Sequence, residues 1–146
     1  MHQARQTYRE NQILQAGPVE LVRLLYRGAI GAINDARRHV RAGAIRERAE
    51  SITRASEIVN ELTGAVDRDR GGDIARNLLL LYDYIQHLLH DANFRQEEGP
   101  LVEAEHLMST LLEAWDQCEA ESSAAPRAVP AGVMESGARV PLSVSC

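Results

Sequence analysis

Four segments of the chain repeat apolar residues at intervals of three and four, and this pattern constrains the fold more than any other feature. Such spacing is typical of an α-helix with one apolar face, and no segment shows the sustained alternation of a strand. The segments are separated by Gly43, by a polar run ending in Gly71-Gly72, and by Gly99-Pro100. Because short connections favour antiparallel neighbours, the sequence predicts an all-α fold, an antiparallel up-down four-helix bundle.

The expected helices have end signals of the usual kinds. Pro18 suits the first position of a helix because its missing N–H has no partner there, and Gly43 is a natural stop. Asp73 is predicted to be the N-cap of the third helix. The predicted helices cover residues 18–42, 44–66, 73–94 and 100–121. Predicted inner residues include Ile45, Ile74, Val102 and Trp115 and, on the first helix, Leu21, Leu24, Leu25, Gly28, Ala29, Ala32, Ile33, Ala36 and Val40.

Two flanking segments lack this periodicity. Residues 1–17 are mostly polar, and we expect them to form an N-terminal arm or a short helix. Residues 122–146 contain three prolines among many small residues, and we expect a disordered tail. The sequence thus predicts one bundle domain over residues 18–121, which suits a chain of 146 residues.

Composition argues against several classes of function. The chain has 21 acidic and 16 basic residues, so no overall positive field favours nucleic acid or an anionic membrane surface. No apolar run approaches the ~20 residues that span a bilayer, and the first residues lack the apolar segment of a secretory signal. Two cysteines are too few for a disulfide framework. We therefore expect a soluble protein of the reducing cytosol, with no nucleic-acid partner and no direct membrane insertion.

Patterns that could support catalysis or metal binding are weak. A di-metal site in a four-helix bundle needs Glu-x-x-His on two helices, and only Glu103 with His106 fits. Asp83, His87 and His90 could align three ligands on the third helix, but this stripe lies toward the expected solvent side. We expect both groups to be solvated, and we predict no catalytic residue, no metal and no cofactor.

The apolar surface exceeds what a small bundle needs. The third helix carries Leu79, Leu80 and Tyr84 beyond its core stripe, and a helix that is apolar almost all round is either deeply buried or binds a partner. A groove for a partner helix follows as a hypothesis. Gly28 and Gly31 each cost about 1 kcal/mol relative to alanine inside a helix. Close approach of a partner backbone and tight packing of the bundle account for these glycines equally well.

Several stretches, taken in order, resemble the FliS family of flagellar export chaperones over about residues 8–118. The most specific are a Leu-Tyr-x-Gly stretch near the start and a Leu-Tyr-Asp-Tyr stretch in the third helix. The matching residues are Tyr8, Gln12, Ile13, Gly17, Pro18, Glu20, Leu21, Val22, Leu25, Tyr26, Gly28, Ala29, Ile30, Ala55, Ile58, Val59, Glu61, Leu62, Asp67, Gly72, Asn77, Leu78, Leu81, Tyr82, Asp83, Tyr84, Ile85, Leu88, Ala92, Asn93, Leu101, Val102, Glu103, Glu105, Leu111 and Trp115.

The resemblance implies a cytosolic, non-catalytic chaperone. Such a protein binds the C-terminal segment of flagellin, prevents premature polymerisation and delivers its client to the flagellar export-gate membrane protein of the type III apparatus. The apolar surface and the resemblance together predict these flagellin-binding residues: Tyr8, Ile13, Leu14, Leu21, Leu24, Leu25, Gly28, Tyr82, Tyr84, Ile85 and Leu88.

Other interpretations stay open at this point. The chain could be a metal-binding four-helix-bundle protein, or a homodimer or larger homo-oligomeric bundle that buries its spare apolar face against itself. A further hypothesis concerns the N-terminal arm, in which Tyr8, Ile13 and Leu14 would stand in for flagellin side chains over part of the client site.

Overall fold

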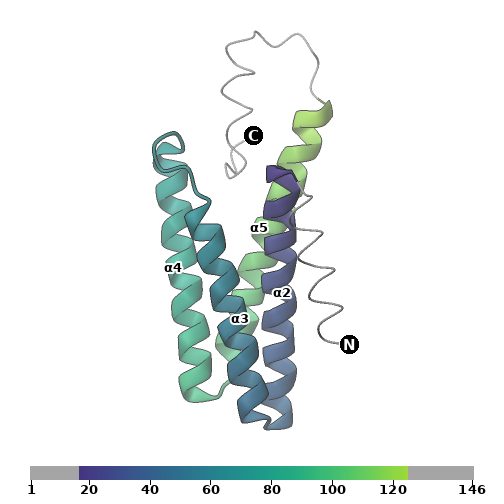
Figure 1. Ribbon diagram of the computed structural model, residues 1–146, viewed down its shortest axis with the longest axis vertical. Helices are drawn as coiled ribbons and strands as arrows, with labels where there is room; N and C mark the ends of the chain where they lie inside the picture. Colours follow the sequence, from purple (N-terminus) through teal and green to yellow (C-terminus); the bar gives the residue numbers. More distant parts are fainter. Residues whose placement is uncertain (1–16, 125–146) are drawn as a thin grey trace.

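The computed structural model describes residues 17–124, and within this range the chain forms four helices and no strand. The predicted arm and most of the predicted tail lie outside the described residues. The helices run alternately up and down the long axis (Figure 1), which confirms the all-α antiparallel bundle. Their bounds are α2 (Pro18–Ala42), α3 (Ile45–Gly64), α4 (Gly72–Arg95) and α5 (Gly99–Ala124).

The four helices form a closed ring of neighbours. α2 packs most extensively against α3, α5 packs against both α2 and α4, and α4 packs less extensively against its two neighbours, α3 and α5. Each helix therefore has two neighbours and one helix diagonally opposite. It follows that the boundary between α2 and α3 and the boundary between α4 and α5 lie on opposite faces of the bundle (Figure 1).

The helix starts agree with the prediction to within one residue, but the N-cap of α4 and the C-terminal ends of α3 and α5 differ; α3 ends at Gly64, two residues before its predicted end. Gly43 adopts the left-handed conformation (φ 69°), and its N–H donates to the Val40 carbonyl oxygen at 3.1 Å, which ends α2 as expected. Gly71, and not Asp73, is the N-cap of α4. Because the chain enters the helix at Gly72, Asp73 lies within the first turn, where its charge favours the positive end of the helix dipole. At the same end of the bundle α5 continues to Ala124, three residues beyond the predicted boundary (Figure 1).

The core is formed by one face of each helix. Trp115 is 6% exposed, so its predicted orientation toward the bundle is confirmed. Tyr26 and Tyr82, on the diagonally opposite helices α2 and α4, meet in the core with their hydroxyl oxygens 2.6 Å apart. The largest completely buried side chains are Tyr82, Ile33, Leu62, Ile85, Leu89, Leu101, Met108 and Val59.

The buried face of α2 matches the prediction in the second half of the helix, where Ala29, Ala32, Ile33 and Ala36 are buried, but differs in the first half. Val22 and Tyr26 are buried, whereas Leu21, Leu24 and Leu25 are only half-buried. Both sets of residues fit a helical repeat of three and four, so the spacing alone could not choose between them. The contact of Tyr26 with Tyr82 fixes the rotation of α2 that places Val22 inside and the three leucines near the surface.

Three more residues predicted as inner are exposed. Ile45, Ile74 and Val102 have exposed fractions of 58%, 37% and 43%. Each belongs to the first turn of its helix. These turns lie at the ends of the bundle, where fewer neighbouring side chains are available to cover an apolar residue.

A polar contact marks the boundary between α3 and α4. The Gln86 amide nitrogen donates to the Ser56 carbonyl oxygen and to Asn60 Oδ1, each at 3.0 Å, and Ser56 Oγ donates to Gln86 Oε1 at 2.7 Å. Nearer the other end, Arg48 Nε donates to Asn93 Oδ1 at 3.2 Å. This boundary therefore combines limited helix packing with side-chain hydrogen bonds.

Candidate functional site

Three of the predicted flagellin-binding residues belong to the buried core: Tyr82, Ile85 and, at 8% exposed, Leu88. Tyr82 and Ile85 are both 0% exposed. Burial raises the pKa of the Tyr82 phenol far above its ordinary value, and the neighbouring Tyr26 raises it further. A side chain without exposed surface cannot contact a partner docked on the bundle, so the prediction is corrected for Tyr82 and Ile85.

The prediction placed Tyr82 and Ile85 on the third helix without resolving their direction, because the apolar pattern of that helix extends around most of its circumference. Tyr8, Ile13 and Leu14 lie outside the described residues. Six predicted residues remain, and each lies at least partly at the surface or at a boundary between two helices. They divide into two groups.

The first group lies on α2 beside α3. Leu21, Leu24, Leu25 and Gly28 follow one another at steps of three, one and three, which places them on one side of α2, and all four are half-buried. A Cβ atom added to Gly28 would lie 3.3 Å from Ile58 Cδ1 of α3. This stripe therefore borders α3. We call this set the α2/α3 seam: Leu21, Leu24, Leu25, Gly28 and Ile58.

The second group lies on α4 beside α5. Tyr84 is 44% exposed and its hydroxyl donates to a Glu103 carboxylate oxygen of α5, whereas Leu88 is 8% exposed. Leu81 and Leu88 lie three residues before and four after Tyr84, and Leu107 and Leu111 lie four and eight after Glu103. We call this set the α4/α5 seam: Leu81, Tyr84, Leu88, Leu107 and Leu111.

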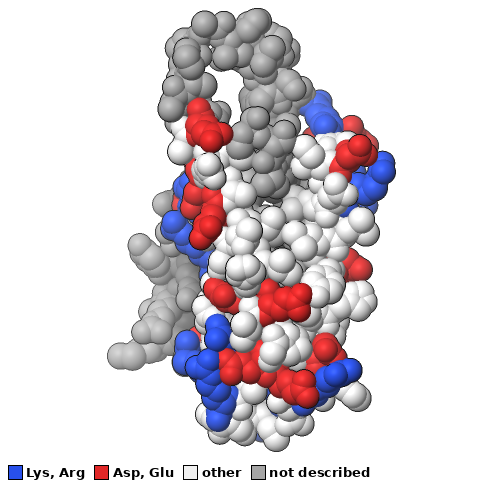
Figure 2. All heavy atoms as spheres, turned by 180° about the vertical axis from the view of Figure 1, so that it is seen from behind, with Lys and Arg blue, Asp and Glu red and all other residues white. Residues whose placement is uncertain are grey.

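The surface around the second seam is sparsely charged. Figure 2, which shows the molecule from behind, has an uncharged strip running lengthwise between charged edges, with acidic side chains crossing it in the lower half. Leu81, Leu107 and Leu111 of this seam are half-buried apolar residues, and apolar surface bordered by charged groups is typical of a surface that binds another polypeptide. The structure thus brings the accessible predicted residues onto two seams, on opposite faces of the bundle, instead of into one groove.

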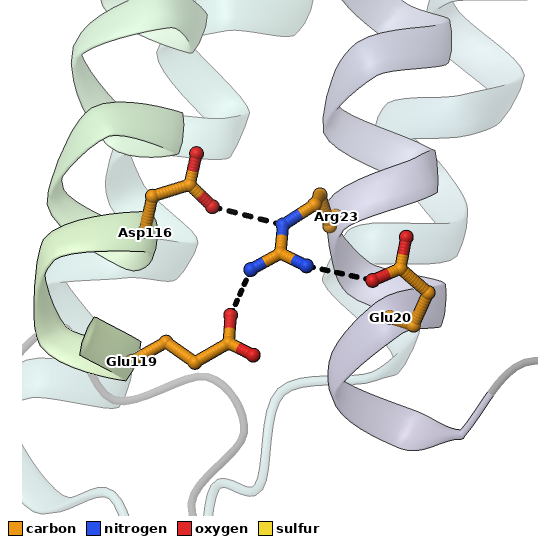
Figure 3. Close-up of polar contacts among 4 residues, drawn as sticks. All are labelled: Glu20, Arg23, Asp116 and Glu119. Carbon is orange, nitrogen blue, oxygen red and sulfur yellow. Dashed lines mark hydrogen bonds and ion pairs between the residues drawn. The ribbon is translucent and has the colours of Figure 1, made fainter. Parts of the chain in front are cut away.

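A cluster of charges ties α2 to α5 at the end of the bundle where α2 begins. Arg23 Nε donates to Asp116 Oδ1 at 2.9 Å and Arg23 Nη1 donates to Glu20 Oε2 at 2.6 Å, while Nη2 contacts Glu119 (Figure 3). The hydrogen bond to Asp116 is the main cause of the raised pKa of Arg23. The sequence offered only the spacing of Glu20 and Arg23 as a signal for this cluster, because its other two members lie on a distant helix.

A second cluster ties α2 to the start of α5 at the other end. Arg37 Nε donates to Glu98 Oε1 at 3.1 Å and Arg41 Nε donates to Glu98 Oε2 at 3.0 Å. The hydrogen bond from Arg41 is the first cause of the lowered pKa of the Glu98 carboxyl, and that from Arg37 lowers it further. Charged contacts therefore hold the boundary between α2 and α5 at both of its ends.

The side chains considered for metal binding are solvent-exposed. His87, His90 and His106 all lie on the surface, and His87 Nδ1 is 2.9 Å from the Asp83 carbonyl oxygen. Within residues 17–124, no three histidine, cysteine or acidic side chains are grouped so that they could hold a metal ion. Over the same range, no helix combines the length and the apolar character needed to cross a membrane.

Comparison with known proteins gives one consistent result. The sequence model of the family described as "Flagellar protein FliS" matches residues 1–122. The chain is 35% identical to the flagellar secretion chaperone FliS of Salmonella typhimurium, in an alignment covering 78% of this chain and 85% of the relative. It is 33% identical to the flagellar secretion chaperone FliSB of Pseudomonas aeruginosa (80% and 92% covered) and 29% identical to FliS of Vibrio cholerae (77% and 82% covered).

Proposed function

Because the chain belongs to the FliS family of flagellar secretion chaperones, which are not enzymes, we propose that its client is the C-terminal segment of flagellin. In this proposal the chaperone binds the segment in the cytosol and covers it, which prevents premature polymerisation. It then delivers the client to the export-gate membrane protein of the flagellar type III apparatus. The family membership supports the existence of a client protein. The two seams support a client segment that is long, apolar on one side and able to wrap the bundle.

The main observation in favour is that the half-buried apolar residues occupy two opposite faces of the bundle. A single short helix docked in one groove would contact only one of these seams. A longer segment that is disordered when free can fold on one seam, pass around the bundle and continue on the other. Such coupled folding lets a chain wrap a large surface, at the cost of ordering entropy during binding.

The two mid-helix glycines of α2 differ in what surrounds them. Packing against Ile58 accounts for Gly28. Gly31 is exposed, and a Cβ atom added there would have nothing within 4 Å, so packing of the bundle does not account for it. We propose that the client backbone approaches α2 closely at Gly31.

The test is a titration of the full chain with a peptide of the cognate flagellin C-terminus, followed by calorimetry. Leu24→Gln probes the α2/α3 seam and Leu107→Gln probes the α4/α5 seam. Ile45→Gln is a matched control, because Ile45 is an exposed apolar residue that belongs to neither seam. Loss of a hot-spot side chain typically costs about 2 kcal/mol or more, so each seam variant should raise Kd by about tenfold or more. The control should stay within about twofold of wild type.

Two outcomes would contradict the proposal at different levels. If all three variants bind as the wild type does, neither seam is the client site. If only one seam variant loses affinity, the client lies on one face and the wrapped path is wrong. Thermal unfolding of each variant, followed by circular dichroism, separates lost binding from lost folding.

We also propose that the N-terminal arm is a weak lid over the client site. Burying Tyr8, Ile13 and Leu14 would contribute roughly 1.5–3 kcal/mol each, against about 1–2 kcal/mol for each of some ten ordered residues. This balance is near zero or unfavourable, so a longer client should displace the arm. Hydrogen exchange of residues 5–16 should change when the flagellin peptide binds, and deletion of residues 1–15 should alter its affinity. Identical exchange together with unchanged affinity would overturn the lid.

A further inference from the structure

We propose that the outer face of α4 is a symmetric interface that binds a second copy of this chain. The first observation is exposure of large apolar side chains on this helix. Leu80 is 64% exposed, Tyr84 is 44% exposed, and Phe94, the single phenylalanine of the chain, is 88% exposed. Side chains of this size stabilise an interface when a partner shields them from water.

The exposed residues form one stripe along the whole helix. They succeed one another at steps of four, three, four, three, four and three, an average of 3.5 residues. That repeat is the one that keeps two packed helices in contact along their length. All of them are exposed except Asp91, which is half-buried. We call this set the α4 stripe: Asp73, Asn77, Leu80, Tyr84, His87, Asp91 and Phe94, with Arg76 and Arg95 at its edges.

The charges of the α4 stripe are complementary to those of an antiparallel copy. Asp73 lies eleven residues before Tyr84 and Arg95 lies eleven residues after it. A twofold axis at Tyr84 therefore places Asp73 of each protomer opposite Arg95 of the other. The same axis brings Arg76, eight residues before Tyr84, near the position of Asp91, seven residues after it.

This arrangement satisfies the rule of a twofold interface, in which residue i meets j while j meets i. Leu80, four residues before the axis, would pack against the turn that holds His87 and Leu88. Within one protomer, Arg76 already pairs with Asp73 (3.5 Å) and Arg95 with Asp91 (2.9 Å), so dimerisation would join two existing ion pairs at each end. The symmetry of the pattern favours a second copy over an unrelated client.

Sedimentation of the full chain without flagellin tests the interface. The wild type should be a concentration-dependent dimer. Leu80→Asp and Phe94→Asp should each raise the dissociation constant by about tenfold or more, since each removes an anchor and introduces a buried charge. Val102→Asp is the matched control, because Val102 is a similarly exposed apolar residue on α5, and its dissociation constant should change less than about twofold.

A charge-reversal pair tests the antiparallel register. Asp73→Arg places arginine opposite Arg95 in its own homodimer, and Arg95→Asp places aspartate opposite Asp73, so each variant alone should dissociate. A mixture of the two variants restores opposite charges at both ends and should recover the dimer as a heterodimer. Raising the salt concentration should weaken this recovery, because exposed ion pairs are screened.

Tyr84 belongs to both the α4/α5 seam and the α4 stripe, but Leu80 and Phe94 belong only to the stripe, so the outcomes for these two residues separate the interface from the client site. A wild type that stays monomeric, or a mixture that does not form heterodimers, overturns the proposal. So does a dimer that Val102→Asp weakens as much as Leu80→Asp does. If the chain is monomeric and Leu80→Asp instead reduces flagellin binding, the α4 stripe belongs to the client. Because no flagellin is present in the sedimentation experiment, its failure would leave the proposed chaperone function untouched.

Discussion

Tyr26 and Tyr82 donate and accept one hydrogen bond between their hydroxyl groups, 2.6 Å apart, across the centre of the bundle. Tyr26 is 3% exposed and Tyr82 is 0% exposed, so water does not offer either hydroxyl a ready alternative partner. Each group satisfies the other, and together they join α2 to the helix diagonally opposite. This relationship has consequences for stability and for its dependence on pH.

Removing both hydroxyls should cost less than the sum of the two single removals. Tyr82→Phe leaves the buried Tyr26 hydroxyl without its partner, and such a group costs about 1–3 kcal/mol of unfolding free energy. The double variant Tyr26→Phe/Tyr82→Phe removes both polar groups and should be less destabilised than the sum of the single variants. Urea unfolding of the four proteins completes the cycle, and strictly additive losses would show that the two hydroxyls do not interact energetically.

The same pair predicts loss of stability at alkaline pH. Burial raises the pKa of both phenols above the ordinary value of 10.0, so the folded state retains protons that the unfolded state releases. Their contribution to stability is therefore complete below pH 10 and decreases as the pH rises beyond the unfolded-state pKa. The urea midpoint should fall above about pH 10, and the double phenylalanine variant should show a shallower fall. Equal slopes would assign the alkaline effect to other groups.

Two glycine substitutions on one helix should act in opposite directions. Gly31 has open space around an added Cβ atom, so Gly31→Ala should stabilise the bundle by roughly 0.5–1 kcal/mol through helix propensity. Gly43 has φ +69°, a conformation that alanine adopts at a cost of about 1–2 kcal/mol, so Gly43→Ala should destabilise it. The difference in Tm between the two variants is the measurement. A lower Tm for Gly31→Ala would mean that this surface is not free in the chaperone alone.

Trp115 should be more sensitive to loss of volume than to loss of its N–H. Its side chain is buried and its Nε1 has no hydrogen-bond partner among the described residues. Trp115→Ala should cost about 3–5 kcal/mol because it leaves a cavity. Trp115→Phe should cost distinctly less, because it keeps an aromatic ring and removes an unsatisfied donor. Urea unfolding distinguishes the two, and a wild-type Tm for Trp115→Ala would contradict the core role.

Arg23 should hold the ends of α2 and α5 together more than it stabilises the whole bundle. Its side chain is 20% exposed and those of its acidic partners are 35–44% exposed, so solvent screens the cluster. Arg23→Met keeps most of the aliphatic length, and we expect a loss of about 1 kcal/mol or less. Hydrogen exchange should accelerate near the start of α2 and the end of α5. Unchanged exchange at both ends would show that the ion pairs do not restrain them.

Local sequence signals were sufficient to predict the helices, but they were insufficient to predict the rotation of each helix and the contacts between helices. Pro18 and Gly43 mark the ends of α2 because their backbone preferences act within the chain segment itself. The rotation of α2 depends instead on Tyr82, which lies 56 residues from Tyr26, and the contacts of Arg23 with α5 span more than 90 residues. Leu24 and Ile85 illustrate the result: both fit an apolar stripe, yet one is half-buried and the other completely buried.

The hydrogen bonds of Gln86 also fix the height of α4 relative to α3. Apolar side chains can exchange neighbours when one helix slides along another, but the Gln86 amide contacts Ser56 and Asn60, which lie one turn apart on α3. A slide of α4 by one turn would remove one of these contacts and leave the amide short of a partner. Every residue on the outside of α4 therefore keeps a fixed position along the bundle axis relative to α3. If two copies meet side by side along this helix, Gln86 therefore sets where the rest of each bundle lies relative to their shared interface.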